Sequence, residues 1–196
     1  MRTRRIGTVV AAAVLATGAA TAPADASTAF HSGTLAYTCT FPGPSAEPVT
    51  ITEDFTGPDT VAPGATFIPT NLSGRITLSD SALAALTDAG YDGVDRGVSA
   101  MTLLATNATH GTTGGTARVD PATWVPGSAT IDFHGGGGMS WTAGSSGVIT
   151  FRRPQWLYLY LSLHRQAGSS GTTAWNPTCT LADGQDAAFT PSLPIG

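Results

Sequence analysis

The chain has 196 residues, which is enough for one domain with a hydrophobic core. Only 11% of the residues are charged, lysine is absent and threonine occurs 31 times, which argues against a coiled coil, a helical bundle and a basic nucleic-acid-binding protein. Gly 24 and Pro 13 together stay below the roughly 25–30% typical of low-complexity disorder. The composition does not indicate a substrate or an activity.

Residues 1–26 have the pattern of a secretory signal peptide. Three arginines among the first five residues precede a run of small and apolar residues, and Ala24-Asp25-Ala26 fits the small-x-small cleavage pattern. The apolar run is too short to span a bilayer comfortably, which disfavours a membrane anchor. We therefore expect cleavage after Ala26 and a secreted, extracellular product, by general secretion or by the less favoured twin-arginine route.

Removal of residues 1–26 takes away three of the nine arginines and one of the 13 acidic residues, which leaves a net charge of −6. An acidic protein is repelled by phosphate backbones and by anionic lipid. The sequence therefore predicts neither a nucleic-acid partner nor a membrane surface. It leaves the oligomeric state open.

The rest of the chain contains short strands separated by glycine, proline, asparagine and aspartate. We expect residues 27–32 to be a disordered N-terminal lead and residues 33–196 to form a single domain. One helix is predicted near residues 80–89, with Ser79 as N-cap and Gly90 as C-cap. The predicted strands are residues 35–41, 49–55, 66–68, 72–78, 98–106, 117–119, 128–133, 139–142, 148–151, 156–164 and 178–181.

This order of elements predicts an all-β fold. Closely spaced strands with turn residues between them are typical of an antiparallel β-sandwich, and we expect an immunoglobulin-like one with one short helix. A parallel sheet is disfavoured because strands and helices do not alternate.

Cys39 and Cys179 are the two cysteines of the chain, and each stands between two threonines in a similar pentad. An oxidising compartment favours their pairing, which would join the first strand to the last. For a loop of 140 residues the chain-entropy estimate is about 4.7–5 kcal/mol. Two free thiols are the alternative, and zinc would need more ligands.

Four segments in this order resemble a known family. They are Tyr37-Thr38-Cys39-Thr40-Phe41-Pro42, Val49-Thr50-Ile51-Thr52 with the following residues 59–64, the Ser-capped helix, and residues 178–185. Over about residues 33–190 the chain resembles the actinobacterial secreted domain of unknown function DUF6801. The resemblance implies an exported β-sandwich with cross-linked terminal strands, and it implies no activity and no catalytic residues. Residues 156–161 depart from the Thr/Val-rich late strands of that family.

Residues 156–165 form the most informative segment. Four leucines occupy one face of the predicted strand, and Trp156, Tyr158 and Tyr160 occupy the other at a spacing of about 6.6–7 Å. Such a row can stack on the sugar rings of a cell-wall glycan or contact an extracellular protein. We predict that these three residues face solvent and form the ligand-binding surface. Alternatively, the rings pair across strands with Trp141 or Phe151, or lie under a loop.

Two glycine-rich segments allow a serine hydrolase as a remote alternative. Residues 134–138 resemble an oxyanion-hole loop, and Ala143-Gly144-Ser145-Ser146-Gly147, repeated at residues 167–171, resembles a nucleophile elbow. An elbow needs a helix after the serine, and no helical pattern follows either segment. Ordinary turns between strands explain both segments better.

The remaining polar residues predict no metal site. Asp88, Asp92 and Asp95 could supply oxygens to calcium, but a helix end and turn is favoured. Glu53 and Asp54 are adjacent in a strand, so they point to opposite faces and make a poor acid–base pair. The histidines are scattered, and each is expected on the surface or in a turn. They are His31, expected in the frayed N-terminus, His110, His134 and His164.

These patterns together predict an extracellular or cell-wall-associated binding or structural module. We expect no catalytic residue, no cofactor and no bound metal. The alternative is a carbohydrate-binding module that uses the aromatic strip, and the second alternative is a small secreted serine hydrolase.

Overall fold

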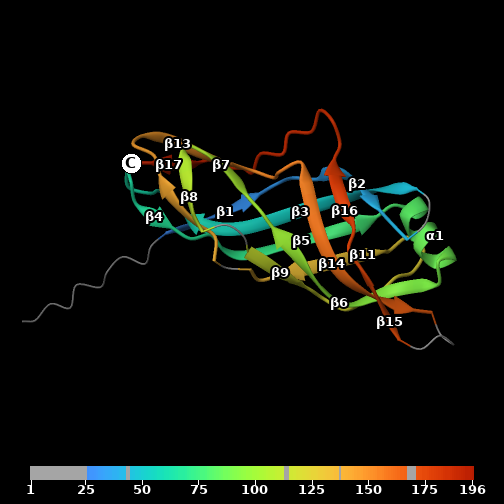
Figure 1. Ribbon diagram of the computed structural model, residues 1–196. Helices are drawn as coiled ribbons and strands as arrows, with labels where there is room; N and C mark the ends of the chain where they lie inside the picture. The colour runs from blue at the N-terminus through green and yellow to red at the C-terminus, as the bar shows by residue number, and fades with distance from the viewer. Residues whose placement is uncertain (1–25, 43–44, 113–114, 137, 167–170) are drawn as a thin grey trace, which may run out of the picture.

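The structure is a computed structural model that describes residues 26–42, 45–112, 115–136, 138–166 and 171–196. Apart from Ala26, the expected signal peptide lies outside the described residues. The elements are shown in Figure 1. They are β1 (Ser27–His31), β2 (Leu35–Thr40), β3 (Ala46–Pro58), β4 (Thr66–Phe67), β5 (Thr70–Leu78), α1 (Asp80–Asp88), β6 (Tyr91–Met101), β7 (Leu104–Thr106), β8 (Ala108–Thr112), β9 (Gly115–Val119), β10 (Ala122–Thr123), β11 (Thr130–His134), β12 (Ser140–Ala143), β13 (Gly147–Arg152), β14 (Trp156–Arg165), β15 (Thr172–Trp175), β16 (Thr178–Leu181) and β17 (Leu193–Ile195).

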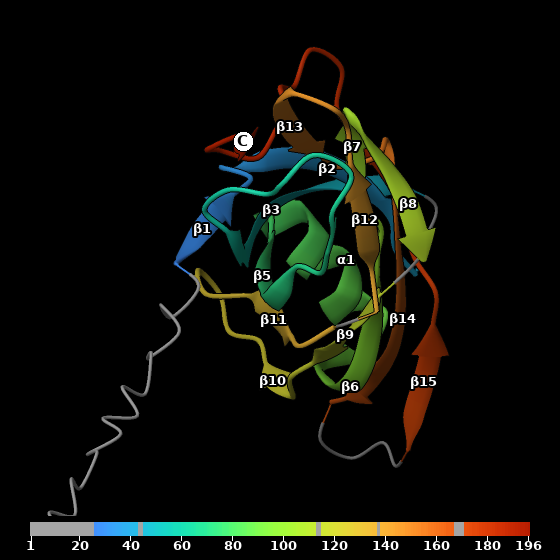
Figure 2. The same ribbon diagram turned by 90° about the vertical axis from the view of Figure 1, so that its left-hand side faces the viewer.

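The main sheet closes on itself as an eight-stranded antiparallel barrel. Its strand order is β6-β9-β11-β5-β3-β2-β16-β14, and β14 pairs back onto β6 from Tyr158 opposite Ala100 to Arg165 opposite Tyr91. Three further strands extend the sheet, with β10 on β6, β15 on β14 and β1 on β3. The view along the barrel in Figure 2 shows this ring of strands.

The predicted immunoglobulin-like sandwich is therefore wrong, although the all-β class with one short helix is correct. Alternating apolar and polar residues give a strand one buried and one exposed face in either architecture. The pattern does not say whether the two ends of a sheet meet. Here the two ends of the sheet meet because β6 pairs with β14 over most of the length of both strands.

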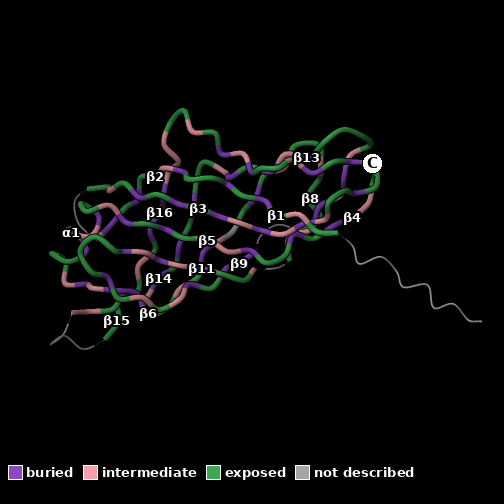
Figure 3. Tube along the Cα trace, turned by 180° about the vertical axis from the view of Figure 1, so that it is seen from behind, coloured by how far each residue is buried: buried purple, intermediate pink, exposed green. Residues whose placement is uncertain are grey.

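The core of the protein fills the barrel from the inward faces of its strands. Buried and exposed residues alternate along the strands in Figure 3. In β2, for example, Leu35, Tyr37 and Cys39 are buried, whereas Thr38 and Thr40 are exposed. This alternation matches the pattern predicted from the sequence.

Helix α1 lies at one end of the barrel (Figure 1) and is seen through the ring of strands in Figure 2. Ser79 caps it by accepting a hydrogen bond from the Ala82 amide on its Oγ at 3.1 Å. Ala82 and Leu86 are fully buried against the barrel. Ala89 forms the C-cap, and Gly90 follows with a φ of 86°, in the left-handed region that favours glycine. Within the described ranges no helix is long and apolar enough to cross a membrane.

The other end of the barrel carries two small sheets, with strand orders β4-β12-β8 and β17-β13-β7. They pack over an aromatic cluster. In this cluster the Phe30 and Phe55 rings are stacked with their centroids 4.8 Å apart, and the Phe151 ring meets both of them edge-on. The Trp141 ring meets the Phe151 ring edge-on with their centroids 6.0 Å apart, and Trp141 is fully buried. Trp141 and Phe151 thus belong to the core cluster.

Residues 27–32 are not the disordered lead that the sequence predicted. Residues Ser27–His31 form β1, which pairs with β3 from Ser27 opposite Pro58 to His31 opposite Asp54. β2 covers β3 only over residues 46–51, so the second half of this long strand offers a free edge. β1 occupies that edge and buries Phe30 to 1% exposure. A five-residue strand with one large apolar residue leaves little signal in the sequence.

Candidate functional site

The three predicted rings lie on the outer surface of β14. Trp156, Tyr158 and Tyr160 are 47%, 49% and 51% exposed. The leucines that alternate with them are at most 3% exposed and face the barrel interior. Closure of the barrel explains this split, because the inner face of β14 contacts the core, whereas its outer face is not covered by any strand or helix that the structure describes. We call the three rings the aromatic strip.

A band of threonines borders the aromatic strip on one side. In β16, Thr180 lies opposite Trp156 and Thr178 lies opposite Tyr158, and Thr38 of β2 lies opposite Thr180. Residues directly opposite each other in a sheet share a face, so these hydroxyls lie beside the rings. Hydroxyl groups both donate and accept hydrogen bonds.

An open hollow borders the strip on its other side. There β6 places Ala100 opposite Tyr158 and Val98 opposite Tyr160. Val98 is 38% exposed and extends the apolar surface beyond the rings. The hollow beside Tyr160 has a volume of about 470 Å³.

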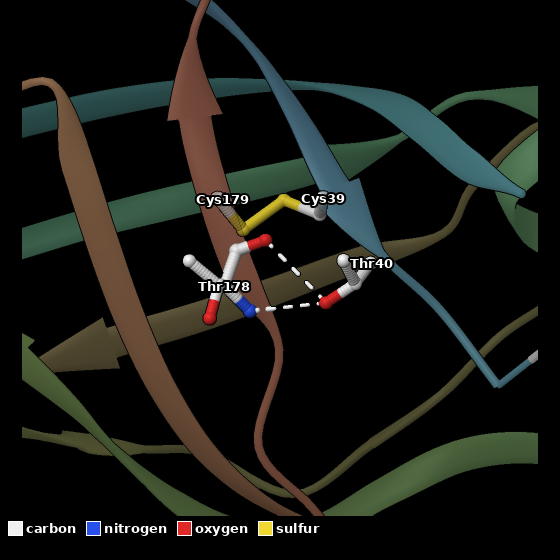
Figure 4. Close-up of a disulfide and its surroundings, with 4 residues drawn as sticks. All are labelled: Cys39, Thr40, Thr178 and Cys179. Atoms are coloured by element: carbon white, nitrogen blue, oxygen red, sulfur yellow. Dashed lines mark hydrogen bonds between the residues drawn. A yellow bond between two sulfur atoms is a disulfide. The ribbon is translucent and has the colours of Figure 1, made fainter.

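The disulfide lies beneath the threonine band. Cys39 of β2 and Cys179 of β16 occupy directly opposed positions with Cα atoms 4.0 Å apart, and their sulfur atoms are bonded (Figure 4). The predicted pairing is confirmed. Both cysteines point inward and are buried, while Thr40 accepts a hydrogen bond from the Thr178 amide at 3.1 Å. The bond therefore holds β16, the strand beside the aromatic strip, to β2.

A buried ion pair is a feature that the sequence prediction missed. Arg153 Nε lies 2.8 Å from Glu53 Oε2, and both side chains are at most 1% exposed. Arg153 also donates a hydrogen bond to the Thr102 carbonyl at 2.9 Å. Burial raises the pKa of Glu53, and the nearby Arg153 opposes this shift. Because both side chains are fully covered, the pair links β3 to the segment after β13 and is not an open site.

The signal for this pair was present in the sequence. Glu53 stands between Ile51 and Phe55 in the inward register of β3, where a carboxylate is costly unless it is paired. Asp54 points outward instead, so the predicted opposite orientation of the two neighbours is confirmed. The partner could not be identified, because Arg153 is distant in sequence.

Three of the four histidines pair with aspartates that lie on another strand or directly after one. Nδ1 of His134 lies 3.1 Å from Oδ2 of Asp120, and Nδ1 of His164 lies 2.6 Å from Oδ1 of Asp92. His31 pairs with Asp54 between β1 and β3. These side chains are exposed, as expected, but His31 lies in a strand and not in a frayed end. The His110 ring lies against the Trp141 ring, with centroids 3.7 Å apart and the planes tilted by 40°.

A polar groove of about 400 Å³ runs along β3, β5 and β11 on the outside of the barrel. Two of its charged side chains pair with each other, since Arg75 donates hydrogen bonds to both carboxylate oxygens of Asp132 at 2.5 and 3.0 Å. The floor is Gly74, where a Cβ would approach Phe133 Cζ to 2.3 Å. The groove is the strongest rival to the aromatic strip, but its arginine, Arg75, is already paired with Asp132.

The hydrolase and calcium alternatives gain no support from the geometry. Ser145 and Ser146 lie in the turn between β12 and β13, so a strand follows where a nucleophile elbow needs a helix. Of the second copy at residues 167–171, all but Gly171 lies outside the described residues. Asp92 is engaged by His164. In the part of the chain that the structure describes, no three or more His, Cys, Asp or Glu side chains are placed to hold a metal ion.

A family model for a family of unknown function, DUF6801, matches residues 36–190. The chain belongs to this family. No curated protein and no solved structure matches the chain. The matched region of this chain contains both cysteines, the aromatic strip and the buried ion pair. The family description assigns no activity to it.

Proposed function

We propose that this DUF6801 domain is an extracellular, non-catalytic binding module that contacts glycan chains through the aromatic strip. The observation that carries the proposal is the half-exposed state of Trp156, Tyr158 and Tyr160 on a single strand. Large apolar groups that cluster in contact with water usually mark a contact site.

The chemistry of the strip suits a sugar chain. Aromatic rings supply a large apolar area with little conformational freedom to lose, and their faces can stack on the apolar faces of sugar rings. A spacing of about 6.6–7 Å between alternate residues of a strand lets successive rings follow an extended chain. The threonines of β2 and β16 add hydroxyl groups for hydrogen bonds along one edge.

An extracellular location is part of the proposal. It is supported by the signal-peptide pattern of residues 1–26 and by the disulfide, because such bonds persist in oxidising compartments. Mass spectrometry of the protein recovered from culture medium tests this location. We expect a chain that begins at Ser27, and a chain that stays inside the cell with residues 1–26 attached would contradict it.

Binding is tested by retention of the purified protein, with its disulfide intact, on insoluble cellulose, chitin, xylan and isolated cell wall. We expect retention on at least one of them, and we expect Trp156→Ala combined with Tyr158→Ala to abolish it. The matched control is Ile68→Ala combined with Val148→Ala, which removes two equally exposed apolar side chains elsewhere.

Retention that survives the Trp156 and Tyr158 substitutions would contradict the assignment of the strip and direct attention to the loops. Absence of retention on every glycan, together with capture of an extracellular protein that needs the same rings, would show a protein-binding module instead. Absence of both would favour a purely structural domain.

A further inference from the structure

The aromatic strip ends beside two arginines on neighbouring strands. β14 places Tyr160 opposite Val98 of β6, and β6 places the same Val98 opposite Arg118 of β9. These three outward side chains therefore form one row across the sheet. Arg96 lies two residues from Val98 on the same face of β6, opposite Ser162. All five residues line the hollow beside Tyr160.

Arg96 and Arg118 are the two described arginines without an ion pair, hydrogen bond or ring contact. Both are exposed. The other described arginines are engaged: Arg75 with Asp132, Arg152 with Asp186, Arg153 with Glu53, and Arg165 with Thr173 and the Tyr91 ring.

The two free guanidinium groups stand out because the chain is acidic overall, with a net charge of −4. Acidic residues outnumber arginines, yet no described acidic side chain forms an ion pair with Arg96 or Arg118. Diagonal neighbours of two paired strands have Cα atoms about 7–8 Å apart, so the two long side chains can converge on one anionic group. A guanidinium matches a carboxylate or another planar anion in a two-pronged hydrogen bond.

We propose that the glycan bound by this domain is acidic, with its anionic group held by Arg96 and Arg118 while adjoining sugar rings stack on the aromatic strip. This inference rests on the proposed glycan-binding function and names its ligand class. Tyr160 is the common boundary of the two parts, because it belongs to the strip and also lines the hollow.

A single-stranded nucleic acid also combines stacking bases with anionic groups, but the charges favour a glycan. Binding a phosphate backbone requires a basic groove that follows the strand. Here two arginines stand at one end of the strip, and the nearby polar groove contains Asp54, Asp120 and Asp132. A chain with sparse charges and many neutral faces fits this surface better.

The test compares two polymers that share one backbone, namely polygalacturonate and its methyl-esterified form. The binding affinity of the full protein for each is measured by affinity electrophoresis at low and high salt. We expect the free acid to bind at least about tenfold more tightly, because charge-assisted hydrogen bonds to two arginines contribute at least that factor. High salt should reduce this preference.

The decisive variant combines Arg96→Gln with Arg118→Gln. We expect it to lose the preference for the free acid and to bind the esterified polymer as the original protein does. Arg75→Gln combined with Arg152→Gln is the matched control, because it also removes two exposed positive charges but leaves the hollow intact. Thermal unfolding verifies that both variants fold.

The outcomes separate this inference from the proposed function. Equal affinity for the two polymers, or a preference that survives the Arg96 and Arg118 substitutions, would overturn the acidic ligand and leave binding through the rings intact. Tighter binding of a single-stranded DNA oligonucleotide than of polygalacturonate would also overturn it. If neither polymer binds, the acidic ligand is wrong, and retention on neutral cellulose, chitin or xylan then decides the proposed function by itself.

Discussion

The positions of Glu53 and Asp54 show how one step along a strand changes the role of a carboxylate. Glu53 points into the barrel and is paired with Arg153, whereas Asp54 points outward and is paired with the exposed His31. A buried pair recovers its desolvation cost only while both partners are present. An exposed pair contributes little, because water and salt screen its charges.

This difference predicts a large effect of Arg153→Ala on stability. Removal of the arginine leaves the buried Glu53 carboxylate uncompensated, and we expect the free energy of unfolding to fall by about 3–5 kcal/mol. Urea denaturation measures the change. Arg152→Ala, at the neighbouring exposed position, is the control and should change the value by no more than about 0.5 kcal/mol. Similar losses in both variants would show that the pair has no special role.

A second residue-scale prediction concerns His164. The hydrogen bond with Asp92 raises the pKa of His164 above 6.5, its value in an unfolded chain. The contribution of this pair to stability is therefore complete below pH 6.5 and is lost as the pH rises through the folded-state pKa. An NMR titration should show that Asp92→Asn lowers the pKa of His164, whereas Asp88→Asn should not. An unchanged pKa in Asp92→Asn would contradict the assignment.

At the scale of elements, β14 and β3 each make different contacts on their different faces or edges. β14 presents leucines to the core and rings to solvent, and its two edges pair with β6 on one side and with β15 and β16 on the other. Its backbone is therefore held over most of its length, which keeps the three rings in line. β3 is long enough to pair with β2 and then with β1 along the same edge.

The role of β1 predicts that Phe30→Ala is strongly destabilising. Phe30 stacks on Phe55 at 4.8 Å and is 1% exposed, so its removal leaves a cavity in the aromatic cluster. We expect the free energy of unfolding to fall by about 3–5 kcal/mol in denaturant titrations. His31→Ala, at the exposed neighbouring position, should have a much smaller effect. No difference between the two variants would be the result expected if residues 27–32 were disordered.

At the scale of the whole molecule, closure depends on contacts between distant parts of the chain. The faces of β14, the Ser79 cap and the pairing of Cys39 with Cys179 were predictable, because each depends on local pattern or on a pair without competitors. Barrel closure, the placement of β1 and the partner of Glu53 were not. They arise from pairings between distant strands, which alternation along one strand does not specify.

The disulfide joins two barrel strands that are 140 residues apart in the sequence. Replacement of both cysteines, Cys39→Ser with Cys179→Ser, should lower the free energy of unfolding by about 2–5 kcal/mol, because the unfolded chain gains freedom. Chemical denaturation measures this loss. Mass measurement after alkylation, with and without reductant, verifies the bond in the original protein. Two thiols that react without reductant would contradict it.

The contact of the aromatic strip with a glycan is tested most directly by an NMR titration that follows the tryptophan indole N–H signals and the backbone amide signals. Oligogalacturonate is the first probe and a neutral xylo-oligosaccharide the second. We expect the Trp156 signal to shift progressively with at least one of them, while the signal of the buried Trp141 stays in place. A saturating shift of residues around His134 and Asp120 in the polar groove, with Trp156 unchanged, would contradict the role assigned to the strip.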